Sequence, residues 1–128
     1  MRVLIADERQ SVRAALRAVL EHDPQCDGLD EAIESGGALA ALGFGADVMI
    51  VEWGLPGLPP AALVSLARER QPGLIIIVLG HLAEARESAL LAGADHFIET
   101  AEPAHEFLQL LHGLCRTLHE QRAPYPAV

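Results

Sequence analysis

Residues 46–57 read Ala-Asp-Val-Met-Ile-Val-Glu-Trp-Gly-Leu-Pro-Gly, and this stretch decides the fold. It contains the uninterrupted apolar run Val48–Val51, which is typical of a parallel strand buried on both faces. Glu52 ends the run, and the glycines and proline that follow indicate a turn. In doubly wound α/β sheets, functional residues lie past the carboxyl ends of the strands, which is where we expect Glu52.

Strand-like and helix-like segments alternate along the rest of the chain. Besides residues 48–51, strands are expected at 3–6, 26–32, 74–79 and 95–98. The segment 26–32 is the least regular and is predicted to be an edge strand. Helices are expected at 12–20, 35–42, 59–70, 83–91 and 103–118, with Ser35 as the cap of the second. Successive βα units predict an α/β fold, a doubly wound five-stranded parallel sheet with helices on both faces.

The bulk composition narrows the class of protein. The chain has 128 residues, which suit one domain, and we expect this domain over residues 1–120 and a tail or linker start over 121–128. Nine basic and 18 acidic residues give a net charge of −9, which disfavours binding to nucleic acid. Cys26 and Cys115 are expected to be free thiols. Without a signal peptide or a membrane-length apolar run, we expect a soluble cytoplasmic protein with no membrane partner.

Three carboxylates are expected to converge at the carboxyl edge of the sheet. Asp7 and Glu8 follow the first strand, and Glu52 ends the third. For strand order 2-1-3-4-5 the ligand-binding crevice lies between these two strands. Two carboxylates about 4 Å apart repel by about 4 kcal/mol at an effective dielectric of about 20. Such a cluster needs a cation, a shared proton or a basic neighbour, and Mg²⁺ suits an all-oxygen ligand set.

Four segments resemble receiver domains of two-component response regulators, and the resemblance covers nearly the whole chain. Residues 1–8 resemble the opening with the acidic pair that holds Mg²⁺, and residues 46–57 resemble the phosphoacceptor strand and its loop. Residues 89–98 are similar to the stretch before the family's lysine, and residues 102–108 to receivers attached to LuxR-type DNA-binding domains. The resemblance implies a flavodoxin-like (βα)₅ receiver fold. The ligands that it implies for a weak Mg²⁺ site are Asp7, Glu8, Glu52 and Gly54.

The resemblance fails at the positions that handle the phosphoryl group. Glu52 stands where the family has its phosphoacceptor aspartate, Gly80 at the switch Ser/Thr and Thr100 at the lysine. Phe97 stands at the switch aromatic and lacks the usual hydroxyl. Phosphotransfer needs a carboxylate at in-line distance and cations to balance the charge, and Glu52 is too long by about 1.5 Å. The sequence therefore predicts a pseudo-receiver that forms no stable acyl phosphate.

We expect a signalling module that is not an enzyme. It would act without phosphorylation, by contact with protein partners and by homodimerisation, to control an attached or partner output, with transcription as the expected output. A Glu52 that mimics phosphate and locks the domain on is less favoured, because the readers at Gly80 and Thr100 are missing. Two alternatives stay open. One is an Mg²⁺-dependent phosphoryl-transfer enzyme that uses Asp7, Glu8 and Glu52, and the other is a ligand-gated receiver with a small molecule in the altered crevice.

Some aromatic and histidine residues allow two interpretations. Trp53 either covers the site or is a partly exposed loop aromatic, and His81 is more simply a loop residue than a metal ligand.

Three histidines recur every seven residues on the last predicted helix. Seven residues span about 10.5 Å of helix, which is too far for two of them to chelate one ion. A solvated face is favoured over a pH-sensitive dimer seam. These histidines are His105, His112 and His119.

Overall fold

Strands and helices alternate in the computed structural model, which describes residues 1–100, 113 and 116. The strands are β1 (Arg2–Ala6), β2 (Gly28–Ala32), β3 (Val48–Glu52), β4 (Ile75–Gly80) and β5 (His96–Glu99). The helices are α1 (Gln10–Leu20), α2 (Ser35–Leu42), α3 (Pro60–Arg70) and α4 (Glu84–Ala92). No helix in this part of the chain is long and apolar enough to cross a membrane.

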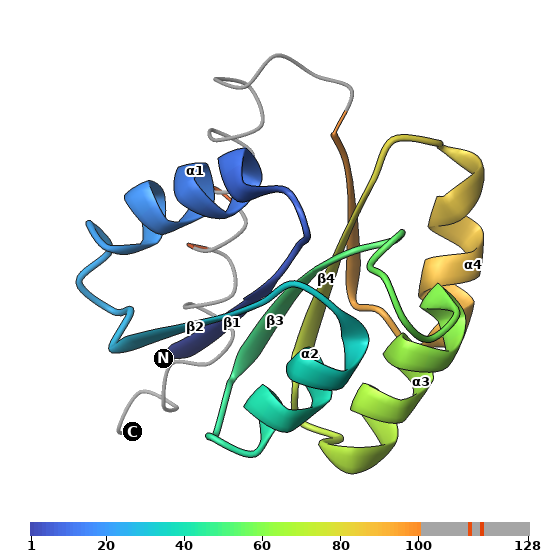
Figure 1. Ribbon diagram of the computed structural model, residues 1–128, viewed down its shortest axis with the longest axis horizontal. Coiled ribbons are helices and arrows are strands. Elements are labelled where there is room, and N and C mark those ends of the chain that lie inside the picture. Colours follow the sequence, from blue (N-terminus) through green and yellow to red (C-terminus); the bar gives the residue numbers. More distant parts are fainter. Residues whose placement is uncertain (101–112, 114–115, 117–128) are drawn as a thin grey trace, which may run out of the picture.

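The five strands form one parallel sheet in the order β2-β1-β3-β4-β5 (Figure 1). This order and the edge position of β2 confirm the predicted doubly wound topology. Residues 113 and 116 are helical, as expected. Several predictions fall outside the described residues, namely the rest of the helix at 103–118, the segment 102–108, Cys115, His105, His112, His119 and the tail 121–128.

The sheet is covered on both faces, as the apolar strands require. Helix α1 lies on one face, and α2, α3 and α4 lie on the other (Figure 1). Alternate residues of β1 therefore enter two different cores: Val3 and Ile5 pack with Leu16 and Leu20 of α1. Leu4 and Ala6 belong instead to the core beneath α2, α3 and α4. All residues of β3 are buried, because this strand lies inside the sheet with helices above and below.

The start of α2 differs from the prediction that Ser35 caps this helix. Glu34 is the cap residue, and its carboxylate accepts hydrogen bonds from the backbone N–H groups of Gly36 and Gly37. Ser35 is the first residue of the helix and is buried. Its hydroxyl accepts a hydrogen bond from Leu58 N at 2.8 Å and so contacts the loop between β3 and α3. The prediction was wrong because the cap residue is Glu34, one position earlier, and the Ser35 hydroxyl instead binds the loop between β3 and α3.

The loop after β3 is held against α2 by two contacts. Ser35 N donates to Pro56 O at 2.8 Å, in addition to the bond that Ser35 Oγ accepts. Gly57 has a φ of 113°, a conformation that side chains rarely adopt. A Cβ at Gly57 would lie 2.0 Å from Ser35 Oγ, so this close approach also requires glycine. These contacts fix the course of the chain directly after Glu52.

Candidate carboxylate pocket and its arginine

Two of the three expected carboxylates, Asp7 and Glu52, meet at the carboxyl edge of the sheet, and we call the cluster that they form with Arg9 the carboxylate pocket. Strands β1 and β3 are neighbours, and Ala6 pairs with Val51 in their register. The next residue of each strand, Asp7 and Glu52, is therefore brought to the same edge. Both are buried, with exposed fractions of 0% and 7%. The topology thus predicts this pair correctly.

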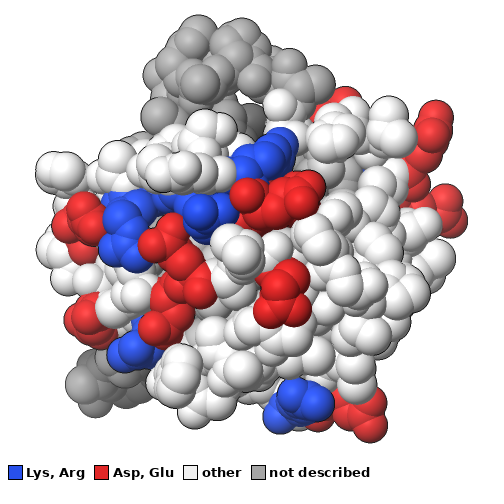
Figure 2. Space-filling model, viewed as in Figure 1, with Lys and Arg blue, Asp and Glu red and all other residues white. Residues whose placement is uncertain are grey.

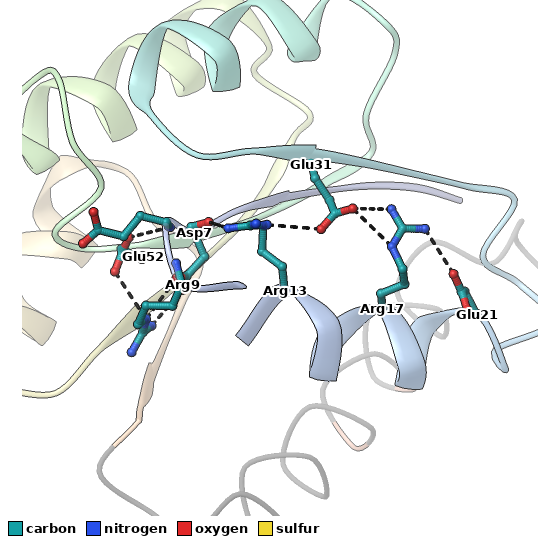
Figure 3. A network of polar contacts seen from close by, with 8 residues as sticks. Asp7, Arg9, Arg13, Arg17, Glu21, Glu31 and Glu52 are labelled. Atoms are coloured by element: carbon teal, nitrogen blue, oxygen red, sulfur yellow. Dashed lines mark hydrogen bonds and ion pairs between the residues drawn. The ribbon is translucent and has the colours of Figure 1, made fainter. Parts of the chain in front are cut away.

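An arginine lies between the two carboxylates (Figure 3). Arg9 Nε is 3.0 Å from Asp7 Oδ1, and Arg9 Nη2 is 2.7 Å from Asp7 Oδ2. The same Nε is 3.5 Å from Glu52 Oε2. The backbone N–H of Arg9 also donates to Asp7 Oδ1 at 2.8 Å. The guanidinium therefore binds Asp7 through two parallel contacts, the geometry in which arginine–carboxylate pairs are strongest. It also faces Glu52.

Glu8 contributes its backbone rather than its carboxylate. Its side chain is exposed, and its N–H donates to Glu52 Oε1 at 2.9 Å. Both oxygens of Glu52 thus have a partner, Oε1 the Glu8 N–H and Oε2 the guanidinium of Arg9. Of the acidic trio expected from the sequence, two members share the pocket and the third supplies a hydrogen-bond donor.

The buried position of Glu52 changes how readily it ionises. Burial raises the pKa of the Glu52 carboxyl above its ordinary value, and the nearby charge of Asp7 adds to the rise. The hydrogen bond from Glu8 N–H and the charge of Arg9 act in the opposite direction. The hydrogen bonds to Asp7 raise the pKa of Arg9, so the arginine stays charged.

The donor groups present do not fit a divalent ion in this arrangement. Both oxygens of Asp7 accept hydrogen bonds from Arg9, and Glu8 is exposed. Gly54, the fourth expected ligand, lies exposed in the turn after β3. Within residues 1–100, 113 and 116, no group of three or more His, Cys, Asp or Glu side chains is placed to hold a metal ion. The basic neighbour that the sequence argument required is therefore Arg9.

Gly80 and Phe97, the expected switch-equivalent residues, form a closely packed pair. Phe97 is buried, and a Cβ added to Gly80 would lie 2.7 and 2.8 Å from two atoms of its ring. The ring therefore occupies the space that any side chain at Gly80 would need. The guanidinium carbon of Arg86 lies 5.2 Å from the centre of the same ring, which is a cation–π contact.

Thr100 stands beside this pair, directly after β5. Its N–H donates to Gly80 O at 2.8 Å, which continues the pairing of β4 and β5. Its hydroxyl oxygen is buried and has no hydrogen-bond partner among the described residues. Thr100, which the sequence resemblance places at the receiver lysine, thus brings a hydroxyl and no positive charge to this position.

Trp53 and His81 are placed differently from each other. Trp53 is half-buried and packs against the core beneath α2, α3 and α4, and its backbone N–H donates to Leu79 O at 2.8 Å. Of the two interpretations, the partly exposed loop aromatic describes it better. His81 is exposed, in agreement with its interpretation as a loop residue.

Arg9, the N-cap residue of α1, begins a row of arginines that continues on the helix with Arg13 and Arg17. Arg13 Nη1 donates to Asp7 O at 2.8 Å, and Arg13 Nε is 3.3 Å from Glu31 Oε1 on β2. Arg17 also contacts Glu31 (Figure 3). Figure 2 shows the resulting band of interleaved basic and acidic side chains on the side of α1 and β2. Sequence reasoning missed this row, although a spacing of four residues places side chains on one helix face.

Comparison with known proteins identifies the fold through structure alone. A scan against protein-family models and a search of curated proteins give no match. Among solved structures, a CheY-like receiver domain protein from Methanospirillum hungatei matches with a TM-score of 0.76 and 21% identity, over 94% of this chain and 97% of that chain. The chain has the receiver fold. This fold confirms the resemblance found in the sequence.

Two further structures agree with the receiver fold. The RcsB response regulator of Salmonella typhimurium has a TM-score of 0.82 at 21% identity, and the match covers 98% of this chain and 63% of that chain. The Mn²⁺-bound response regulator Rcp1 has a TM-score of 0.78 at 12% identity, and the match covers 98% of this chain and 99% of that chain. In this chain, Arg9 contacts the two buried carboxylates.

Proposed function

We propose that the chain is an atypical receiver domain, a signalling module that is not an enzyme and does not depend on phosphorylation. It acts by contact with protein partners, including a second copy of itself, and controls an attached or partner output. The receiver fold supports the signalling role. The contacts that both oxygens of Glu52 already make support the independence from phosphorylation.

The observation that carries this proposal is that Glu52 is already engaged. A phosphoacceptor must present an oxygen to the phosphorus of the donor, with cations available for the transferred oxygens. Glu52 Oε1 instead accepts from Glu8 N, and Oε2 faces Arg9, whose guanidinium is committed to Asp7. The same engagement of Asp7 and Glu52 weighs against the alternative of an Mg²⁺-dependent phosphoryl-transfer enzyme.

Transcription is the output that the neighbouring structures favour. The RcsB structure is described in terms of conformational change for DNA interaction, and this chain spans 63% of its length. The net charge of −9 disfavours DNA contact by the receiver-like domain itself. We therefore assign any contact with DNA to an attached or partner domain.

Incubation with acetyl phosphate and Mg²⁺, followed by intact mass measurement, tests the independence from phosphorylation. The wild-type protein should gain no stable phosphoryl group, because Glu52 is held by Glu8 N–H and Arg9. A phosphorylatable receiver domain in the same reaction shows that the donor is active. A stoichiometric phosphoryl adduct that disappears in the Glu52→Gln variant would overturn the proposal.

A further inference from the structure

The carboxylate pocket places two buried acidic groups beside the guanidinium of Arg9. Asp7 and Glu52 are both buried, and like charges in such a place repel strongly. Among the described residues, Arg9 is the cation that contacts both of them, at 2.7 and 3.0 Å from Asp7 oxygens and 3.5 Å from Glu52 Oε2. Its own backbone N–H is bonded to Asp7, so the side chain starts from an anchored position.

We infer that Arg9 is the resident cation of this pocket: its guanidinium takes the place of a divalent ion between Asp7 and Glu52 and excludes Mg²⁺ and Mn²⁺. This inference shares the contact between Arg9 and Glu52 with the proposed independence from phosphorylation, and it goes further by stating which cation the two carboxylates hold. A metal ion would have to displace the two-pronged contact between Arg9 and Asp7. It would also enter beside a fixed positive charge.

The surroundings hold Arg9 in position. The residue stands at the N-cap of α1 with an extended backbone, and its carbonyl accepts from Arg13 N at 3.1 Å. Arg13 in turn donates to Asp7 O at 2.8 Å. Both ends of the Asp7–Arg9 segment are thus bonded to α1. The guanidinium is a part of the folded site and lies two residues from the carboxylate that it binds.

Mn²⁺ titration of the full chain tests the inference, with calorimetry and the fluorescence of Trp53 as readouts. Trp53 is the single tryptophan and directly follows Glu52. The wild-type protein should show no saturable binding at millimolar Mn²⁺. Arg9→Gln leaves the two carboxylates without their cation and should bind Mn²⁺ tighter by about tenfold or more, because a neighbouring positive charge repels a divalent ion.

Arg17→Gln is the matched control, since Arg17 lies on the same helix and pairs with Glu31 and Glu21, outside the pocket. It should behave like the wild type. Saturable Mn²⁺ binding by the wild type would overturn the inference. So would a folded Arg9→Gln protein that binds no Mn²⁺, or an equal gain in Arg17→Gln.

A variant that does not fold is also informative. If Arg9→Gln is unfolded in the presence of a chelator, millimolar Mn²⁺ should restore its circular dichroism spectrum, because a ligand of the native state stabilises that state. Failure of Mn²⁺ to restore the fold would count against the inference. The phosphorylation test uses the wild-type protein and an intact mass, so the two proposals fail separately.

Discussion

The ring of Phe97 packs into the space that a side chain at position 80 would occupy. The ring atoms of Phe97 lie 2.7 and 2.8 Å from the point where a Cβ of Gly80 would be, which is closer than such atoms approach. We expect Gly80→Ala to lower the free energy of unfolding by about 1–3 kcal/mol, the usual cost of overpacking a core. Urea unfolding measures this change.

The control for this variant is Gly73→Ala, because a Cβ at Gly73 would meet nothing within 4 Å. Its effect should stay within about 0.5 kcal/mol. The double variant Gly80→Ala/Phe97→Leu removes the outer ring atoms and should cost less than the sum of its single changes, by about 0.5 kcal/mol or more. Strict additivity would contradict the proposed steric pairing of Gly80 and Phe97.

The ionisation of Glu52 gives a pH dependence of stability with a defined sign. Burial raises the pKa of Glu52 in the folded protein, so the folded state binds this proton more tightly than the unfolded state. The stabilisation is full below the ordinary pKa of 4.5 and is lost as the pH rises through the raised pKa. The unfolding free energy of the wild type, relative to Glu52→Gln, should therefore fall as the pH rises through this window.

Arg9 provides an internal check on this pH dependence. Its charge lowers the pKa of Glu52 and so opposes the effect of burial. The comparison is repeated between Arg9→Gln and Arg9→Gln/Glu52→Gln. The difference in unfolding free energy between these two proteins should keep falling to a higher pH than the difference between the wild type and Glu52→Gln. A difference that instead increases with pH would mean that the bonds from Glu8 and Arg9 outweigh burial and that the carboxylate stabilises the fold in its charged form.

The loop between β3 and α3 depends on its glycine for two reasons, which a matched pair of variants separates. Gly57 and Gly45 both have positive φ, at 113° and 94°. A Cβ at Gly57 would collide with Ser35, whereas one at Gly45 would meet nothing within 4 Å. Gly45→Ala should cost about 1–2 kcal/mol for the left-handed backbone alone. Gly57→Ala should carry the same backbone cost and an additional cost of about 1–3 kcal/mol, because its Cβ also overpacks the contact with Ser35.

Urea unfolding of the two alanine variants measures this difference. Ser35→Ala/Gly57→Ala removes the hydroxyl that the new Cβ would meet, and so should recover part of the extra cost of Gly57→Ala. Equal costs for Gly57→Ala and Gly45→Ala would show that the loop moves away from Ser35 without penalty. The loop would then not be held against α2.

The strands and their order were predictable because their residues follow simple rules. Apolar runs such as Val48–Val51 are buried on both faces of the parallel sheet, and the strand order places Asp7 and Glu52 at one edge. The identity of the pocket's cation was not predictable in the same way. Arg9 follows two acidic residues in an exposed-looking turn, and only the folded backbone at the start of α1 directs its guanidinium to Asp7.

The packing of Phe97 on Gly80 was equally invisible in the sequence. A glycine and an aromatic residue 17 positions apart carry no signal of contact, and only the pairing of β4 with β5 brings them together. From the sequence alone, Gly80 indicates only the loss of a hydroxyl at this position. The structure adds a physical reason for glycine there, since the buried ring leaves no room for a side chain.

The whole molecule carries a net charge of −9, and this charge sets how two copies approach each other. Two such copies repel, and added salt screens the repulsion over a Debye length of about 8–10 Å near physiological ionic strength. The homodimer that we propose should therefore become tighter as the salt concentration rises. Sedimentation velocity at several salt concentrations measures this, with the protein concentration held constant.

The same experiment distinguishes the proposed receiver from one that phosphorylation controls. Acetyl phosphate and Mg²⁺, at matched ionic strength, should leave the dimer fraction unchanged, because Glu52 is held by Glu8 N–H and Arg9 and is not open to a phosphoryl donor. Glu52→Gln should then show the same indifference. A dimer fraction that rises with the donor in the wild type, and not in Glu52→Gln, would mean that this carboxylate accepts a phosphoryl group and that the engaged pocket opens in solution.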